Sequence, residues 1–212
     1  MDFSESADLT DQSGAITKRG TCTFEGKTTD CVQKIYTVDN YSKISETLTR
    51  FSAEVRELGP KIIHLGDDRR AVYMEYIDCD TVKRYVEKID IFVEIDRAKF
   101  TKLLSAIAAF IVRLEDMGLC HDDLHQSNLM VCVSDTDEIR IRMIDLDTLR
   151  STKTDSGADA CDDYRTIGES IFFCLVNRYR FLSDYEAKSD EVRAIVANMD
   201  VDANLKQYLS GR

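Results

Sequence analysis

Residues 121–128 read His-Asp-Asp-Leu-His-Gln-Ser-Asn, and residues 144–147 read Ile-Asp-Leu-Asp. These two stretches place four carboxylates and two side-chain amides beside apolar neighbours. Phosphoryl transfer needs one carboxylate that positions the attacking hydroxyl and other oxygen ligands that hold magnesium against the nucleotide phosphates. Asp and Asn side chains supply oxygen ligands of that kind. The two stretches therefore contain the groups that phosphoryl transfer requires.

A β-hairpin is predicted between the two stretches. Leu129–Val133 and Glu138–Ile144 have the apolar and β-branched character of strands, and residues 134–137 between them form a turn signal. In a hairpin the start of the first strand lies beside the end of the second. Asn128 and Asp145 flank the hairpin symmetrically, so we expect them side by side. The sequence thus predicts a metal site that uses Asn128 and Asp145.

The secondary-structure patterns change character at about residues 78–80. Before this point they predict strands over 16–36, with a turn at 24–27, then a helix over 42–58 and strands over 62–65 and 71–77. After it, an apolar stripe predicts a long helix that is capped by Asp96 and ends at Gly118, and more helices follow the hairpin. This order predicts an α+β fold, in which a small antiparallel sheet with one helix precedes a mostly helical part.

The charge and hydropathy patterns exclude some classes of partner. Thirty-nine acidic side chains against 28 basic ones give a net charge of -11, which repels polyanions and argues against a nucleic-acid partner. The first twelve residues are acidic and polar, unlike a signal peptide, and the apolar stretch 103–112 is too short to span a bilayer. We therefore expect a soluble, cytoplasmic protein with no membrane partner, in the host cytosol if the source is a virus or a bacterial effector.

The seven cysteines (22, 31, 79, 120, 132, 161 and 174) are scattered, and no two form a C-x-x-C pair. This pattern predicts neither a zinc site nor a disulfide framework. A reducing compartment is expected on that basis.

The stretch His121–Asn128 resembles the catalytic loop of protein kinases and their relatives, H-x-D-L-x-x-x-N, and Asp145–Asp147 resembles the D-F-G motif that follows it. The step from Asp123 to Asn128 is five residues, as in that signature. The resemblance implies that Asp123 is the catalytic base and that Asn128 and Asp145 bind magnesium. It also implies ATP as the phosphoryl donor.

Further motifs follow in the order that the family requires. Residues 31–34 resemble the V-A-I-K strand, so Lys34 would contact the ATP phosphates, and Glu54 resembles the glutamate that pairs with this lysine. The backbone of Glu75, Tyr76 and Ile77 would receive the adenine. Gly14 would belong to the loop over the phosphates. Asp163, with Gly168 five residues later, resembles the start of the central helix of the larger lobe.

The resemblance implies one kinase-like domain over residues 1–212, with an N-lobe of about 1–77, a hinge at about 75–80 and a truncated C-lobe of about 81–212. Taken singly, Lys34 and Glu54 also fit an edge lysine and a solvated helix face. His121 and His125 would suggest a metal pair only on a helix, so a structural hydrogen-bonding role is predicted for His121.

Several positions depart from the protein-kinase pattern. Only Gly14 of the expected G-x-G-x-x-G lies at a suitable distance before Lys34, with Gly20 as a second member or a turn residue. Asp122 replaces the arginine of H-R-D, which in many kinases receives a phosphate on the activation loop. His125 stands where protein kinases often have lysine, as in aminoglycoside-type and sugar-type kinases. The short stretch from Asp145 to Asp163 resembles a minimal or atypical kinase of viral, effector or RIO-like type.

These features favour an ATP- and magnesium-dependent serine/threonine protein kinase of minimal type, because the chain has little length for the helical substrate domain of small-molecule kinases. The alternatives are a small-molecule kinase and a kinase-shaped binding module without catalysis. A protein substrate with a basic or hydroxyl-bearing segment is expected from the acidic charge. A stabilising or activating protein partner is expected from the short larger lobe.

Overall fold

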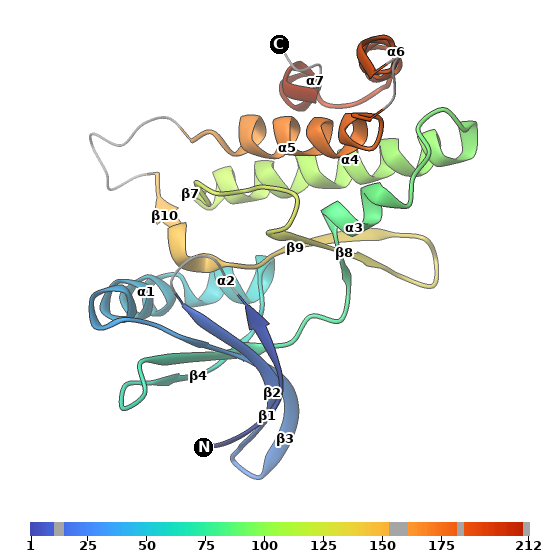
Figure 1. The fold of residues 1–212 in the computed structure, drawn as a ribbon. Coiled ribbons are helices and arrows are strands. Elements are labelled where there is room, and N and C mark those ends of the chain that lie inside the picture. Colours follow the sequence, from blue (N-terminus) through green and yellow to red (C-terminus); the bar gives the residue numbers. More distant parts are fainter. Residues whose placement is uncertain (11–14, 153–160, 182–184, 210–212) are drawn as a thin grey trace. The chain divides into compact units, whose positions relative to one another are not determined.

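The computed structural model describes residues 1–10, 15–152, 161–181 and 185–209. The chain has the predicted α+β fold and divides into two compact units, Met1–Asp78 and Cys79–Arg212 (Figure 1). The first unit contains a five-stranded antiparallel sheet, and the second is mostly helical.

The sheet of the first unit has the strand order β1-β2-β3-β5-β4. Its strands are β1 (Asp2–Thr10), β2 (Ile16–Phe24), β3 (Lys27–Ile35), β4 (Ile62–Gly66) and β5 (Ala71–Glu75). The turn at Glu25 and Gly26 joins β2 to β3, where both residues have positive φ. The predicted strands and turn are thus confirmed.

Strand β1 was not predicted, because its acidic, polar sequence lies at the edge of the sheet and lacks a clear apolar alternation. It also explains Gly20, which pairs with Glu5 across β1 and β2. A Cβ at Gly20 would lie 2.1 Å from the carbonyl oxygen of Ser4 and 2.9 Å from the Phe3 ring. Gly20 therefore permits close approach of β1 and lies within a strand, not in a turn.

The predicted helix over 42–58 is two helices, α1 (Val38–Arg50) and α2 (Ser52–Leu58). They are separated by Phe51, whose φ of -107° and ψ of 29° lie outside the helical range. The apolar positions are nevertheless buried as expected, including Ile44, Leu48 and Leu58. The prediction of a single helix is wrong because Phe51 carries no glycine or proline signal that would mark the break.

The second unit is built on the helix pair α4 (Glu94–Asp116) and α5 (Asp163–Asn177), which lie side by side in Figure 1. Every predicted apolar position of α4 is buried, namely Phe100, Leu103, Leu104, Ile107, Ile111 and Leu114. The N-cap is Val93 and not Asp96, which lies in the first turn and accepts a hydrogen bond from the backbone N of Asp90 at 3.1 Å. Three further helices are described in this unit, α3 (Val82–Glu87), α6 (Tyr185–Ala197) and α7 (Ala203–Leu209).

Short strands complete the second unit. They form a three-stranded sheet of β6 (Asp80–Thr81), β8 (Leu129–Val133) and β9 (Ile139–Met143), and a pair of β7 (Leu119–Cys120) with β10 (Arg150–Ser151). A 3-10 turn, η1 (Leu146–Thr148), lies between β9 and β10. None of the helices that the structure describes is both long enough and apolar enough to cross a lipid bilayer.

Two disulfides correct the expectation for the cysteines. Cys79 is bonded to Cys132 and Cys120 to Cys161, with Cα–Cα distances of 5.2 and 5.8 Å. The pairing of β6 with β8 matches Asp80 with Val131, which brings Cys79 next to Cys132. Partners 53 and 41 residues apart cannot be recognised from spacing. The disulfides remove the basis on which a reducing compartment was expected, and a cytoplasmic location stays a prediction.

Candidate active site

The hairpin β8–β9 brings the two polar stretches of the sequence together. Leu129 pairs with Met143, and the backbone N of Ile144 donates to the carbonyl oxygen of Asn128 at 2.8 Å. The strand bounds agree with the predicted hairpin to within one residue. The backbones of Asn128 and Ile144 are thus hydrogen-bonded to each other, and Asp145 is the next residue along the chain.

Asn128 is tied to Asp123 through its amide nitrogen. The Nδ2 atom donates to the carbonyl oxygen of Asp123 at 2.9 Å and to its carboxylate Oδ2 at 3.3 Å. The side chain of Asn128 is buried, whereas that of Asp123 is 48% exposed. Because the amide nitrogen is used within the loop, the Asn128 Oδ1 is the atom that could ligate a hard cation. The Asp123 carboxylate is accessible to a substrate hydroxyl.

Asp145 has a left-handed backbone, with φ of 57° and ψ of 72°, and it precedes η1. This conformation is costly for most residues with a side chain, although Asp and Asn tolerate it better than others. Backbone strain of this kind is concentrated at functional sites. The conformation agrees with a specialised role for Asp145, and its place in a metal site stays a prediction.

His121 is completely buried, and its Nε2 lies 3.0 Å from the carbonyl oxygen of Ile144. The Nδ1 atom has no hydrogen-bond partner in the described structure. A carbonyl oxygen can only accept, so Nε2 is the donor in this hydrogen bond. The bond joins the catalytic-loop stretch to the residue before Asp145, which confirms the predicted structural role of His121.

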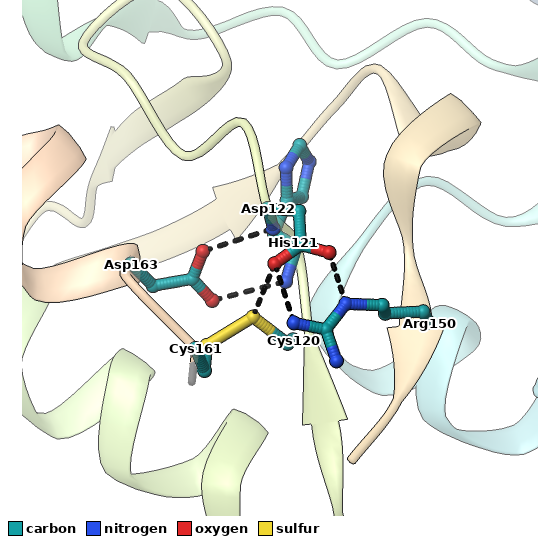
Figure 2. Close-up of a disulfide and its surroundings, with 6 residues drawn as sticks. All are labelled: Cys120, His121, Asp122, Arg150, Cys161 and Asp163. Atoms are coloured by element: carbon teal, nitrogen blue, oxygen red, sulfur yellow. Dashed lines mark hydrogen bonds and ion pairs between the residues drawn. A yellow bond between two sulfur atoms is a disulfide. The ribbon is translucent and has the colours of Figure 1, made fainter. Parts of the chain in front are cut away.

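Asp163, at the start of α5, holds the backbone of the same stretch (Figure 2). Its carboxylate accepts from the backbone N of His121 at 2.9 Å and from that of Asp122 at 3.1 Å. The residue is 2% exposed, and this burial raises the pKa of its carboxyl, while the two backbone donors oppose the rise.

On the same helix, a Cβ at Gly168 would lie 2.6 Å from the Cβ of Tyr208, so the glycine permits close packing of α7.

Replacing Asp163 with asparagine is expected to lower the free energy of unfolding by about 1–3 kcal/mol, because one of the two buried backbone donors loses its acceptor. Urea denaturation measures this change. Asp162→Asn is the matched control, because Asp162 is half exposed and forms an ion pair with Arg165 one helical turn away, so its loss should cost less than about 0.5 kcal/mol. Equal stabilities for the two variants would contradict a supporting role of Asp163.

His125 faces the candidate base. Its Nδ1 accepts a hydrogen bond from the backbone N of Ser127 at 3.1 Å, which leaves Nε2 as the atom that carries the proton. The Nε2 atom lies 3.8 Å from the Asp123 Oδ2. The ring is therefore oriented towards the Asp123 carboxylate and not held on a helix with His121 as a metal pair.

The remaining predicted residues belong to the first unit. Lys34 lies in β3 opposite Val72 of β5 and is 5% exposed, so it is not a solvated edge lysine. Glu54 lies in α2 and is half-buried. The pairing of Lys34 with Glu54 stays a prediction. Gly14 lies outside the described residues.

The segment expected to receive adenine follows β5. The backbone N of Glu75 donates to the carbonyl oxygen of Lys61 at 2.8 Å, and the N of Tyr76 lies 3.4 Å from the carbonyl oxygen of Asp30. Ile77 is buried. These contacts fix the backbone of the segment, and its contact with adenine stays a prediction.

Sequence reasoning missed two groups beside the catalytic loop. Arg150 forms an ion pair with Asp122, and Cys120 is bonded to Cys161 (Figure 2). The two cysteine sulfurs lie as close to the carboxylate of Asp163 as the ligands of one metal ion would. The sulfurs of Cys120 and Cys161 are bonded to each other, however, so they are not free thiolate ligands. The carboxylate of Asp122, at a position where kinases have arginine, indicated that a basic side chain pairs with it. The sequence did not show that this side chain is Arg150.

Comparison with known proteins agrees with this geometry. Residues 81–163 match the model of the lipopolysaccharide kinase (Kdo/WaaP) family. No curated protein matches the chain. The matched range contains the catalytic loop, the hairpin and Asp145, and it ends at Asp163. The match covers less than half of the chain; it supports a kinase-like phosphotransferase and agrees with the resemblance of the sequence to minimal, atypical protein-kinase-like enzymes.

Proposed function

We propose that the protein uses ATP and magnesium to phosphorylate a hydroxyl group of a carbohydrate-containing acceptor. The observation that carries the proposal is the match of residues 81–163 to the lipopolysaccharide kinase family, over the same residues whose contacts form the candidate site. Lipopolysaccharide is the substrate that the family name gives. Its carbohydrate portion offers hydroxyl acceptors.

The donor atoms in the second unit fit magnesium. Magnesium prefers hard oxygen ligands and is held in nucleotide sites by one or two protein side chains together with the phosphates. The Asn128 amide is oriented by its bonds to Asp123 so that Oδ1 is the remaining donor, and Asp145 follows the residue bonded to Asn128. When bound, magnesium neutralises the charge that develops on the phosphates.

Asp123 is the proposed base. Its carboxylate accepts from Asn128 at 3.3 Å and is otherwise half open to solvent, which suits a group that must meet an incoming hydroxyl. It orients the acceptor hydroxyl and takes its proton as the acceptor oxygen bonds to the γ-phosphorus and the bond from that phosphorus to the ADP leaving group breaks. Lys34, buried in β3, is proposed to contact the ATP phosphates.

A carbohydrate acceptor replaces the protein acceptor that the sequence favoured. Chain length and the acidic charge were the grounds for the protein acceptor, whereas both the family match and His125 favour a small-molecule or sugar acceptor. His125 occupies the position where protein kinases often have lysine, and its Nδ1 accepts a hydrogen bond from the backbone N of Ser127.

The acceptor class can be tested with labelled ATP. The purified protein is incubated with γ-labelled ATP, magnesium and either de-acylated lipopolysaccharide or a generic basic protein, and the products are separated. We expect label on the oligosaccharide that depends on magnesium, with little on the protein. Label on the basic protein alone would favour a protein acceptor over a carbohydrate acceptor. Undetectable nucleotide binding would contradict both and leave a kinase-shaped binding module.

A further inference from the structure

The segment that follows Asp145 is fastened to the catalytic loop by an ion pair. Arg150 donates through Nη2 to the Asp122 Oδ1 at 2.9 Å, and its Nε donates to the Asp122 Oδ2. This is the two-bond geometry in which a guanidinium matches a carboxylate, and it is stronger and more directional than a single contact. The side chains of Arg150 and Asp122 are 21% and 33% exposed, so the pair is partly shielded from water.

The backbone supports the same attachment. Strand β10 pairs with β7, with Arg150 opposite Cys120 and Ser151 opposite Leu119. The backbone N of Thr152 also donates to the carbonyl oxygen of Gly118 at 2.9 Å. Only η1 and one further residue separate Asp145 from Arg150. The ion pair therefore fixes the chain directly after the candidate magnesium ligand.

A disulfide links the chain to the catalytic loop a second time, at Cys161. Cys161 is bonded to Cys120, and the Cys120 Sγ lies 3.0 Å from the Asp122 Oδ1. In Figure 2 the Arg150 side chain approaches Asp122 from the side opposite to Asp163. Residues 120–122 thus receive an ion pair, a disulfide and the two backbone hydrogen bonds of Asp163.

The charges are the reverse of those in kinases that are switched by phosphorylation. There an arginine of the catalytic loop pairs with a phosphate on the activation segment, and the segment becomes ordered only after phosphorylation. Here the loop supplies the carboxylate and the segment supplies the guanidinium, which is always charged at physiological pH. The pair is therefore complete without a phosphate.

We infer that Asp122 and Arg150 are a positioning pair, which holds the segment after Asp145 against the catalytic loop and makes phosphorylation of that segment unnecessary. Neither residue needs to touch the substrate. Their effect on turnover is exerted through Asp123, which follows Asp122 directly, and through Asp145, which η1 and Leu149 separate from Arg150. The inference rests on the proposed phosphotransferase function.

A double-mutant cycle with MgATP as the probe tests the pair. Asp122→Asn is suitable because Asn tolerates the positive φ of 61° at this position, and Arg150→Gln removes the opposite charge. Each single variant should lower the kcat of ATP turnover roughly tenfold with little change in KM, because positioning is impaired while nucleotide contacts remain. The double variant should lose no more than the worse single variant, because the two residues act as one unit. Arg150→Lys should retain part of the activity.

A control variant and a second readout accompany the double-mutant cycle. Asp190→Asn breaks an exposed ion pair with Arg193 on α6 and should leave kcat unchanged. Amide hydrogen exchange of residues 146–152 should be faster in both single variants than in the wild type, and this readout does not require activity. Absence of ATP turnover in the wild type would count against the proposed function. The exchange rates would still show whether the ion pair between Asp122 and Arg150 holds residues 146–152 in place.

Three results would overturn the inference. They are fully additive losses in the double variant, unchanged exchange in the single variants, and turnover that begins only after the wild-type protein has been phosphorylated. Mass spectrometry of the active protein detects any such phosphate.

Discussion

Asp123→Asn is expected to lower the kcat of phosphoryl transfer by about 10²–10⁴-fold, the usual contribution of a positioned general base. Asparagine has the same shape and can keep a contact to Asn128, but it cannot accept the proton of the attacking hydroxyl. The Asp123 carboxylate is half exposed and accepts a hydrogen bond from the Asn128 Nδ2 at 3.3 Å, and the His125 Nε2 lies 3.8 Å from its Oδ2. Its replacement should therefore change the chemistry more than the stability. Steady-state rates with MgATP measure the effect.

The control for this variant is Asp135→Asn, which removes one negative charge from the exposed hairpin turn. It should have wild-type rates. The Asp123→Asn protein should bind MgATP and unfold at nearly the wild-type temperature, which would show that the fold is intact. A kcat within a factor of about three of the wild type would mean that Asp123 is not the base.

Asp145→Asn is expected to weaken magnesium-dependent ATP binding at least roughly a hundredfold, because a neutral amide replaces a carboxylate ligand. Asparagine is chosen because it tolerates the left-handed backbone at this position, where φ is 57°. Titration calorimetry with ATP, in magnesium and in excess chelator, separates the metal-dependent part of the affinity.

Asp137→Asn is a closely matched control for the Asp145 variant. Asp137 has nearly the same φ, 59°, and lies in the exposed hairpin turn. Any cost of placing asparagine in a left-handed backbone is therefore present in both proteins. Equal loss of affinity in the two variants, or an unchanged affinity in Asp145→Asn, would remove Asp145 from the metal site.

The parts of the site that could be predicted from sequence are those built by local structure. The β8–β9 hairpin is fixed by two strand patterns and a polar turn only a few residues long, so the pairing of Leu129 with Met143 follows from the sequence. His121 was assigned a structural role from its place in the motif, and its bond to Ile144 agrees. The stripe on α4 was read correctly because its 3.6-residue period is long and regular.

The parts that could not be predicted depend on contacts between distant residues. Cys120 and Cys161 are brought together by the packing of β7 near the start of α5, and no spacing rule gives that result. Arg150 reaches Asp122 because β10 pairs with β7, and a two-residue strand leaves no periodic signal. The break at Phe51 likewise lacks a local marker. Long-range geometry, rather than composition, determined these features.

We propose that this chain transfers the γ-phosphoryl group of ATP with Asp123 as the base. The most direct measurement follows ATP by ³¹P NMR in the presence of magnesium and de-acylated lipopolysaccharide, for the wild type and for Asp123→Asn. We expect the wild type to convert ATP to ADP with a new phosphate-ester signal on the oligosaccharide, and the variant to lack this signal. Equal conversion by the two proteins, or no conversion by the wild type, would contradict it.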